Sequence, residues 1–340
     1  MRWQCTRLVL PLLLGGALSV HAGASVGDWT PVLNEKGIKG YSRSVAGSDI
    51  LEFRSTVVIP ARIELIGEIL RDVEGLKRTS KSCQEVRIIE YQDRNNYTFY
   101  VAYSFPFPLT DRDVVIKVTT TYDFALGRAL SDLRAVATPK LPPRKGYVRI
   151  TDMRAQFVFE YLGRERTGIV YTSRTDPGGH IPDFLVNYSN KRALLSSAED
   201  LRAATLKPEY QKAAATSQDH ALVEGILKDP QAMGRIARNR LAEFIHDAGF
   251  VALLAGDPGV MAALLSGEGG VGETLLHGWG SRGSQRRAVA ELLRRFLGGR
   301  GVAAAIVEAV AGDQRLLDRL LSGQGGLAEL RTRVPLPEGK

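Results

Sequence analysis

Arg112 and Asp113 are the residues whose type and position indicate the most specific chemistry. They begin a segment in which polar and apolar residues alternate, and alternation at period two places every second side chain on one face of a strand. Four side chains share a face there: Arg112, Val114, Ile116 and Val118. A guanidinium at the edge of an apolar face can donate two parallel hydrogen bonds to a phosphate. An arginine in this place can equally serve the fold, by pairing with Asp111, Asp113 or a backbone carbonyl.

Two further segments place aromatic side chains on a single strand face. One face carries Tyr97, Phe99, Val101 and Tyr103, and the other carries Phe157, Phe159 and Tyr161. Such faces form either ordinary core or the wall of an apolar cavity.

Signatures of catalysis are missing from the sequence, which contains no G-x-S-x-G, H-E-x-x-H or G-x-x-x-x-G-K-[ST] motif. Four histidines lack the spacing of metal ligands: His180, His220, His246 and His277. We therefore expect no catalytic residue, no metal and no cofactor. An enzyme would need an acid/base pair inside the cavity, for which Asp113, Glu160 and Arg154 are the candidates.

The elements that must position these residues are strands up to about Asp176. Alternation predicts strands over Leu51 to Ile59, Glu85 to Tyr91, Tyr97 to Tyr103, Asp113 to Thr121, Tyr147 to Thr151, Gln156 to Tyr161 and Gly168 to Arg174. Apolar residues at helical spacing predict a helix over Ala61 to Asp72, after the first of these strands.

A long amphipathic helix is predicted directly after the turn Asp176-Pro177-Gly178-Gly179. Its apolar stripe comprises Ile181, Phe184, Leu185, Tyr188, Leu194, Leu195, Ala198 and Leu201. A curved antiparallel sheet followed by one such helix predicts an α+β fold in which the helix lies across the concave face.

Two motifs flank these strands. The first reads FPFPLTDRD over Phe105 to Asp113, and the second reads DPGGHIPDFLVN over Asp176 to Asn187. Between them, Lys145 to Ile150 reads KGYVRI. Together these segments resemble the START (steroidogenic acute regulatory-related lipid transfer) domain family, most nearly its phosphatidylcholine-transfer branch. The resemblance covers about Asp28 to Leu206.

This resemblance implies a helix-grip fold, in which a U-shaped antiparallel sheet and a long C-terminal lid helix enclose one lipid. It also implies that the arginine of the R-D motif, here Arg112, meets the lipid phosphate. The ligand-binding residues that we predict from strand alternation, from the lid helix and from this resemblance are Arg112, Asp113, Tyr97, Phe99, Tyr103, Val114, Ile116, Phe157, Phe159, Phe184, Leu185 and Tyr188.

The first residues have the pattern of a signal peptide over positions 1–24. Arg2 and Arg7 accompany an apolar run from Leu8 to Leu18, and Ala22-Gly23-Ala24 resembles a cleavage site. We therefore expect a periplasmic or secreted protein. The formal net charge of +8 favours transient contact with anionic membrane surfaces. Nucleic acid is not an expected partner, because runs of lysine and arginine and interleaved stacking aromatics are missing.

Beyond about Thr205 the strand pattern stops, and the composition predicts an all-helical region. An internal repeat supports this prediction: Ala255-Gly256-Asp257 and Leu264-Leu265-Ser266 recur as Ala311-Gly312-Asp313 and Leu320-Leu321-Ser322. Repeats of this size usually stack as helical hairpins. We therefore divide the chain into a signal peptide (1–24), a START lipid-binding domain (25–208) and an all-helical repeat-like domain (215–332).

These features predict a lipid-binding or lipid-transfer protein that encloses one phospholipid or sterol-like lipid, with the helical domain as a docking module for a membrane or a protein partner. Two alternatives remain open at this point. One is an enzyme similar to the cyclases and aromatases of the same superfamily. The other is a ligand-sensing module that regulates a partner bound by the helical domain.

Overall fold

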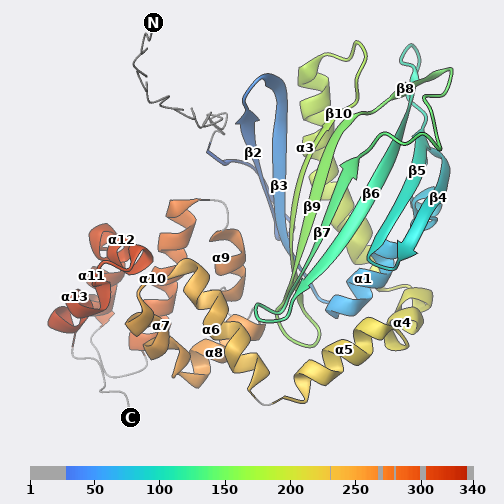
Figure 1. The fold of residues 1–340 in the computed structure, drawn as a ribbon. Coiled ribbons are helices and arrows are strands. Elements are labelled where there is room, and N and C mark those ends of the chain that lie inside the picture. Colours follow the sequence, from blue (N-terminus) through green and yellow to red (C-terminus); the bar gives the residue numbers. More distant parts are fainter. Residues whose placement is uncertain (1–27, 230, 267–270, 279–280, 299–303, 335–340) are drawn as a thin grey trace, which may run out of the picture.

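A computed structural model of the protein describes residues 28–229, 231–266, 271–278, 281–298 and 304–334. The predicted signal peptide lies outside the described residues. Within them, an antiparallel sheet occupies the first part of the chain and helices occupy the last part (Figure 1). The predicted α+β fold is therefore confirmed.

The sheet has ten strands. They are β1 (Thr30–Glu35), β2 (Ile38–Val45), β3 (Ser48–Ile59), β4 (Cys83–Asp93), β5 (Asn96–Tyr103), β6 (Asp111–Asp123), β7 (Arg128–Ala135), β8 (Tyr147–Arg149), β9 (Asp152–Tyr161) and β10 (Thr167–Asp176). Their order is β1-β2-β3-β10-β9-β7-β6-β5-β4, with antiparallel neighbours throughout, and the short β8 pairs with β6 in parallel.

Each strand predicted from alternation is present, but β1, β2 and β7 were not predicted. The inward side chains of β7 include the small residues Ala129, Ser131 and Ala135, which give a weak strand signal. Its pairing with β6 and β9 on either side holds it in the sheet. Tertiary context therefore decides the structure of this segment.

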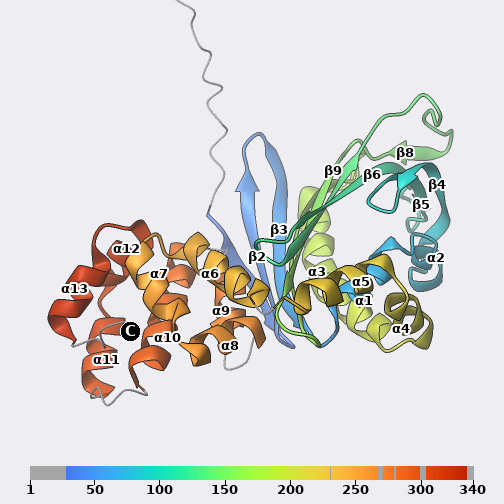
Figure 2. The ribbon, with the colours of Figure 1, turned by 60° about the horizontal axis from the view of Figure 1, so that its bottom comes forward.

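Three helices belong to the sheet: α1 (Ile63–Arg71), α2 (Gly75–Thr79) and α3 (Asp183–Thr205). Helices α1 and α3 lie within the bend of the sheet (Figure 2). They bury Ile66 of α1 and Ala198 of α3 in one core with Val57 of β3 and Ile169 of β10. This inner side of the sheet is here called the concave face.

The remaining helices are α4 (Pro208–Ala215), α5 (Gln218–Leu227), α6 (Ala232–Phe244), α7 (Ala248–Ala255), α8 (Pro258–Ser266), α9 (Val271–Gly278), α10 (Arg282–Gly298), α11 (Ala304–Ala311), α12 (Gln314–Ser322) and α13 (Gly326–Arg333). Helices α4 and α5 pack on α1 and so extend the first structural unit beyond the predicted boundary at 208. Helices α6 to α13 share a separate apolar core.

The internal repeat of the sequence corresponds to a repeated structural unit. Helices α7 and α8 recur as α11 and α12, and the aspartate between the two helices has the same role in both copies. Asp257 accepts hydrogen bonds from the backbone N–H groups of Gly259 and Val260, and Asp313 accepts them from Arg315 and Leu316. The repeated aspartate therefore begins the second helix of each hairpin.

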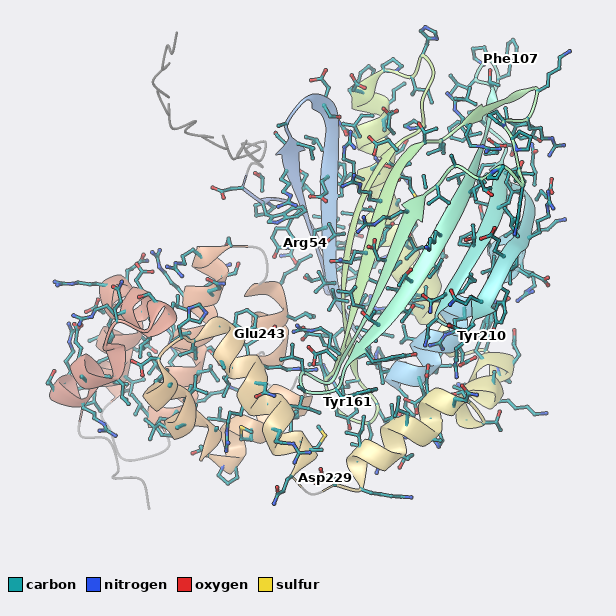
Figure 3. All side chains as sticks on the ribbon, in the orientation of Figure 1. Arg54, Phe107, Tyr161, Tyr210, Asp229 and Glu243 are labelled. Carbon is teal, nitrogen blue, oxygen red and sulfur yellow. The ribbon has the colours of Figure 1, made fainter. Side chains whose placement is uncertain are left out.

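The helical region is attached to the sheet at two places. On the outer face of the sheet, Leu276 of α9 packs against Val158 and Val170. At the β6–β7 turn, the side chain of Arg240 in α6 is 5% exposed and donates to three backbone carbonyls: Leu126 at 2.7 Å, Gly127 at 2.8 Å and Tyr161 at 2.6 Å. Figure 3 labels Tyr161 and Glu243 at this junction.

Among the described residues, no individual helix has the length and apolar composition needed to cross a membrane. Helices α7 and α8 reach this length and composition only when they are counted together, across a bend of 91°.

We predict that Arg240→Ala destabilises the whole protein by about 3 kcal/mol, because it removes the three hydrogen bonds of a buried guanidinium to backbone carbonyls. Urea unfolding of the full chain measures this change. Arg238→Ala is the matched control, since Arg238 lies on the same helix and is exposed. Equal unfolding midpoints for the two variants would show that the junction contributes little to stability.

Candidate functional site

An apolar cavity lies at the end of the sheet where α1, α5 and α6 meet the β6–β7 turn. It contains about 1090 Å³ of space that protein atoms do not fill, counting the part that opens to solvent. Tyr161 lines this cavity, and Figure 3 shows Tyr161 and Phe107 at opposite ends of the sheet. The cavity is therefore remote from the loop that carries the first motif.

Space remains on the sheet side of the cavity because the inward side chains of β7 are small, whereas those of the neighbouring β9 are large. Ala129 and Ser131 of β7 stand directly opposite Phe159 and Phe157 of β9. The ring of Phe157 stacks on that of Phe159 at 5.7 Å and on that of Tyr171 at 4.5 Å, between centroids. The aromatic rings hold one another in place beside β7, whose short side chains cannot fill the space.

Helices close the other side of the cavity. Helix α1 contributes Ile63, Gly67 and Leu70, all of which face the cavity. Helices α5 and α6 contribute a further apolar set: Leu222, Val223, Ile226, Leu227, Met233 and Ile236. This second set was not predicted. It lies beyond the segment that resembles a START domain, and the sequence gives no signal that it returns to the sheet.

A network of charged and polar groups joins α1 to α5 at the cavity wall. Asp219 of α5 pairs with Arg71 of α1 at 2.6 Å and with Arg94 at 3.3 Å. Arg71 also donates to the hydroxyl of Tyr122 at 3.0 Å. Burial raises the pKa of Tyr122. The phenol is consequently neutral at physiological pH and can act as a donor to Asn95 or Asp219.

A second network joins the same two helices around the buried Glu64, which also faces the cavity. Oε1 of Glu64 lies 2.5 Å from Nε of Arg62 and 3.0 Å from Nδ1 of His220 in α5. Arg62 reaches on to Glu224 of α5 at 2.7 Å, and Arg164 also pairs with Glu224, at 2.9 Å. Helix α5 is therefore held in place largely by ion pairs.

The structure places the seven predicted aromatic and aliphatic residues of the strands on the concave face. Tyr97, Phe157 and Phe159 line the cavity. The remaining four pack in the adjoining core cluster on the same face: Phe99, Tyr103, Val114 and Ile116. Burial raises the pKa of Tyr103 to about 12, as expected for a phenol enclosed among apolar groups.

Asp113, which we predicted as a ligand-binding residue, does not line the cavity. Strand alternation turns its side chain to the opposite face of the sheet from Val114. There it is completely buried, pairs with Arg149 at 2.8 Å and accepts a hydrogen bond from Tyr100 at 3.2 Å. Asp113 therefore has no place in this cavity, and its carboxylate stabilises the outer layer of the fold.

Arg112 lies at the edge of the concave face, as alternation predicts, but its guanidinium binds backbone carbonyls. The side chain is 2% exposed and donates to Gly178 at 3.0 Å, to Pro177 at 3.4 Å and to Thr110. It also lies over the ring of Phe105, with 4.6 Å to the centroid. In this conformation Arg112 ties the first motif to the second. The predicted contact with a lipid phosphate has no geometric support here.

The turn that Arg112 holds depends on glycine. Gly178 and Gly179 have φ values of 66° and 74°, in the left-handed region that side chains rarely adopt. A Cβ atom on Gly179 would lie 3.1 Å from Nη2 of Arg112. Both glycines are therefore needed to bring the turn against the guanidinium at the start of α3.

Three predicted residues of the lid helix do not pack on the sheet. Phe184, Leu185 and Tyr188 are exposed, and the value for Phe184 is 70%. The buried residues of α3 include Leu194 and Ala198, which belong to the predicted stripe, and Val186, which does not. Near the start of the helix, Asn187 docks α3 on β3, where its side chain accepts a hydrogen bond from Leu51 N–H and donates one to Asp49 O, both at 3.0 Å.

Comparisons with known proteins agree with this architecture. The chain is 31% identical over 200 residues to an uncharacterized protein of Pseudomonas aeruginosa, a match that covers 59% of this chain and 98% of that protein. It is 23% identical over 203 residues to phosphatidylcholine transfer protein of Rattus norvegicus, covering 59% and 89% of the two chains.

The solved structure of human STARD10 has the same fold, with a TM-score of 0.51 and 22% sequence identity, over 58% of this chain and 81% of that one. The family model of the START domain matches residues 20–209, which is more than half of the sequence. With its motifs, its strand order and its C-terminal helix in agreement, the chain belongs to the START domain family.

Proposed function

We propose that this protein binds one lipid, places the hydrocarbon part of the lipid in the apolar cavity, and carries it between membranes. The observation that carries the proposal is the cavity itself, whose wall is formed mainly by apolar side chains within a START fold. The similarity to phosphatidylcholine transfer protein supports a phospholipid or a lipid of similar shape as the ligand.

The proposal extends to the place of action. A signal peptide over 1–24 would deliver the protein to the periplasm or outside the cell. A carrier there meets membranes only transiently, and the positive net charge of the chain favours anionic membrane surfaces. The helical region from α6 to α13 is then free to contact a protein partner through its outer surface.

A carrier is favoured over a cyclase-like enzyme by the positions of the candidate acid/base residues. Asp113, Glu160 and Arg154 all lie on strand positions that face away from the cavity. Glu160 is paired with Arg128 at 2.7 Å. The acid/base pair that we considered from the sequence is therefore not assembled in the cavity.

Filling the cavity tests the proposal. We predict that Ala129→Phe lowers lipid occupancy at least about tenfold, because the new ring occupies space that the ligand needs. The measurement is native mass spectrometry of the full chain after incubation with phosphatidylcholine vesicles. Ala125→Phe is the matched control, since Ala125 is exposed in the same hairpin. Equal occupancy in both variants, with unchanged folding, would exclude the cavity as the lipid site.

The lid helix generates a second prediction. Asn187→Ala removes the two hydrogen bonds that dock α3 on β3, and we expect lipid exchange between vesicles to accelerate by about tenfold. A fluorescent phosphatidylcholine transfer assay measures the rate. Ser189→Ala, at an exposed position of the same helix, should transfer lipid at the parental rate. If Asn187→Ala also leaves the rate unchanged, α3 does not control access.

A further inference from the structure

Helix α5 lies outside the part of the chain that matches the START family, yet it faces the cavity. The family match ends at residue 209, and α5 spans Gln218–Leu227. Leu222, Val223 and Ile226 from this helix line the cavity opposite Ala129 and Phe159 of the sheet. The wall of the cavity is thus built from two parts of the sequence.

Protein atoms cover the apolar side of α5 only in part. None of the ten residues of this described helix is fully buried, and Leu222 remains 39% exposed. Helix α10, by contrast, buries eight side chains in the core of the helical region. These apolar side chains face the cavity, and protein atoms leave them partly exposed. A hydrocarbon ligand in the cavity would cover them.

Ion pairs and a capping hydrogen bond hold α5 in this position. Asp219 pairs with Arg71 and Arg94, Glu224 pairs with Arg62, and the side chain of Ser217 caps the helix by accepting a hydrogen bond from His220 N–H. These contacts fix the helix along α1 without using its apolar side. The apolar side therefore stays available to a ligand while the helix remains docked.

The side chains at this end of the cavity suit the hydrocarbon part of a lipid better than its headgroup. Val223 and Ile226 share the cavity wall with the carbon-rich side chains of Met233, Ile236 and Phe159, and the charged Asp219 of the same wall is already paired with Arg71. A charged headgroup placed there would lose its hydration without gaining a matched partner, whereas hydrocarbon would lose nothing. The end of an acyl chain is the occupant that fits.

We propose that α5 forms part of the lipid-binding site, and that Val223 and Ile226 contact the end of the acyl chain and so set the chain length that the protein prefers. This inference rests on the proposed lipid-binding function. It assigns to the segment after the START domain a direct part in ligand selection, in addition to any role in docking to a partner.

The test is a competition for lipid uptake by the full chain. Vesicles contain equal amounts of dimyristoyl and dioleoyl forms of phosphatidylcholine and of phosphatidylethanolamine, and the bound lipids are extracted and quantified by mass spectrometry. We expect Ile226→Trp to raise the ratio of short to long chains by about fivefold, because it shortens the cavity, and Ile226→Ala to change the ratio in the opposite direction. Ala221→Trp, on the exposed side of the same helix, should leave the ratio at the parental value.

The outcomes separate the two proposals. Lipid uptake by all the proteins with an unchanged ratio in both Ile226 variants would overturn the role of α5 and leave lipid binding intact. A parent protein that takes up none of the four lipids would overturn both. Circular dichroism and unfolding midpoints identify a misfolded variant. If Ile226→Trp misfolds, the chain-length ratio of Ile226→Ala decides the question, because this substitution only removes atoms.

Discussion

Hydrocarbon must be shielded from water on every side, and a curved sheet shields it on one side only. Each buried methylene contributes about 0.8 kcal/mol, so exposing a chain of roughly sixteen carbons would cost on the order of 12 kcal/mol. The other elements of this protein can be understood from that requirement. The small side chains of β7 make room, α1 covers the space from one side, and α5 and α6 close the end where the β6–β7 turn leaves the sheet open.

Charged groups hold the elements of this enclosure in place. Arg112 fixes the turn before α3, and Asp113 joins β6 to Arg149 on the outer face. Arg240 fixes α6 against the carbonyls of the β6–β7 turn, and Asp219 fixes α5 along α1. Each ion pair or buried guanidinium positions an element whose apolar side faces the concave face or the cavity. Polar groups that reach the cavity wall, such as Tyr122, are the ones that could distinguish between lipids.

The sequence was sufficient to predict the fold of the first region and only part of the site. Tyr97, Phe157 and Phe159 alternate clearly and line the cavity as predicted. The outer position of Asp113 also follows from alternation, so its assignment to the site rested on its proximity to Arg112. For Arg112 the sequence allowed two interpretations, phosphate or backbone carbonyl, and the structure shows the second because the Gly178-Gly179 turn comes within its reach.

The contribution of α5 could not be predicted because it depends on contacts between distant parts of the chain. Leu222, Val223 and Ile226 form an apolar side that would suit any helical hairpin, and the sequence places them next to the repeats of the helical region. The polar contacts of Asp219, His220 and Glu224 hold the helix against the sheet and α1. Such pairs have no local signature, because each partner is one charged residue among many.

The most direct test is photo-crosslinking of the full chain. The protein is first loaded from vesicles with a phosphatidylcholine that carries a photoreactive group at the end of one acyl chain. The cross-linked residues are identified by peptide mass spectrometry. The account predicts labelling of α5 between Gln218 and Leu227, together with strands β7 and β9. Labelling confined to the exposed residues Phe184, Leu185 and Tyr188 of α3, with none in α5 or these strands, would contradict it.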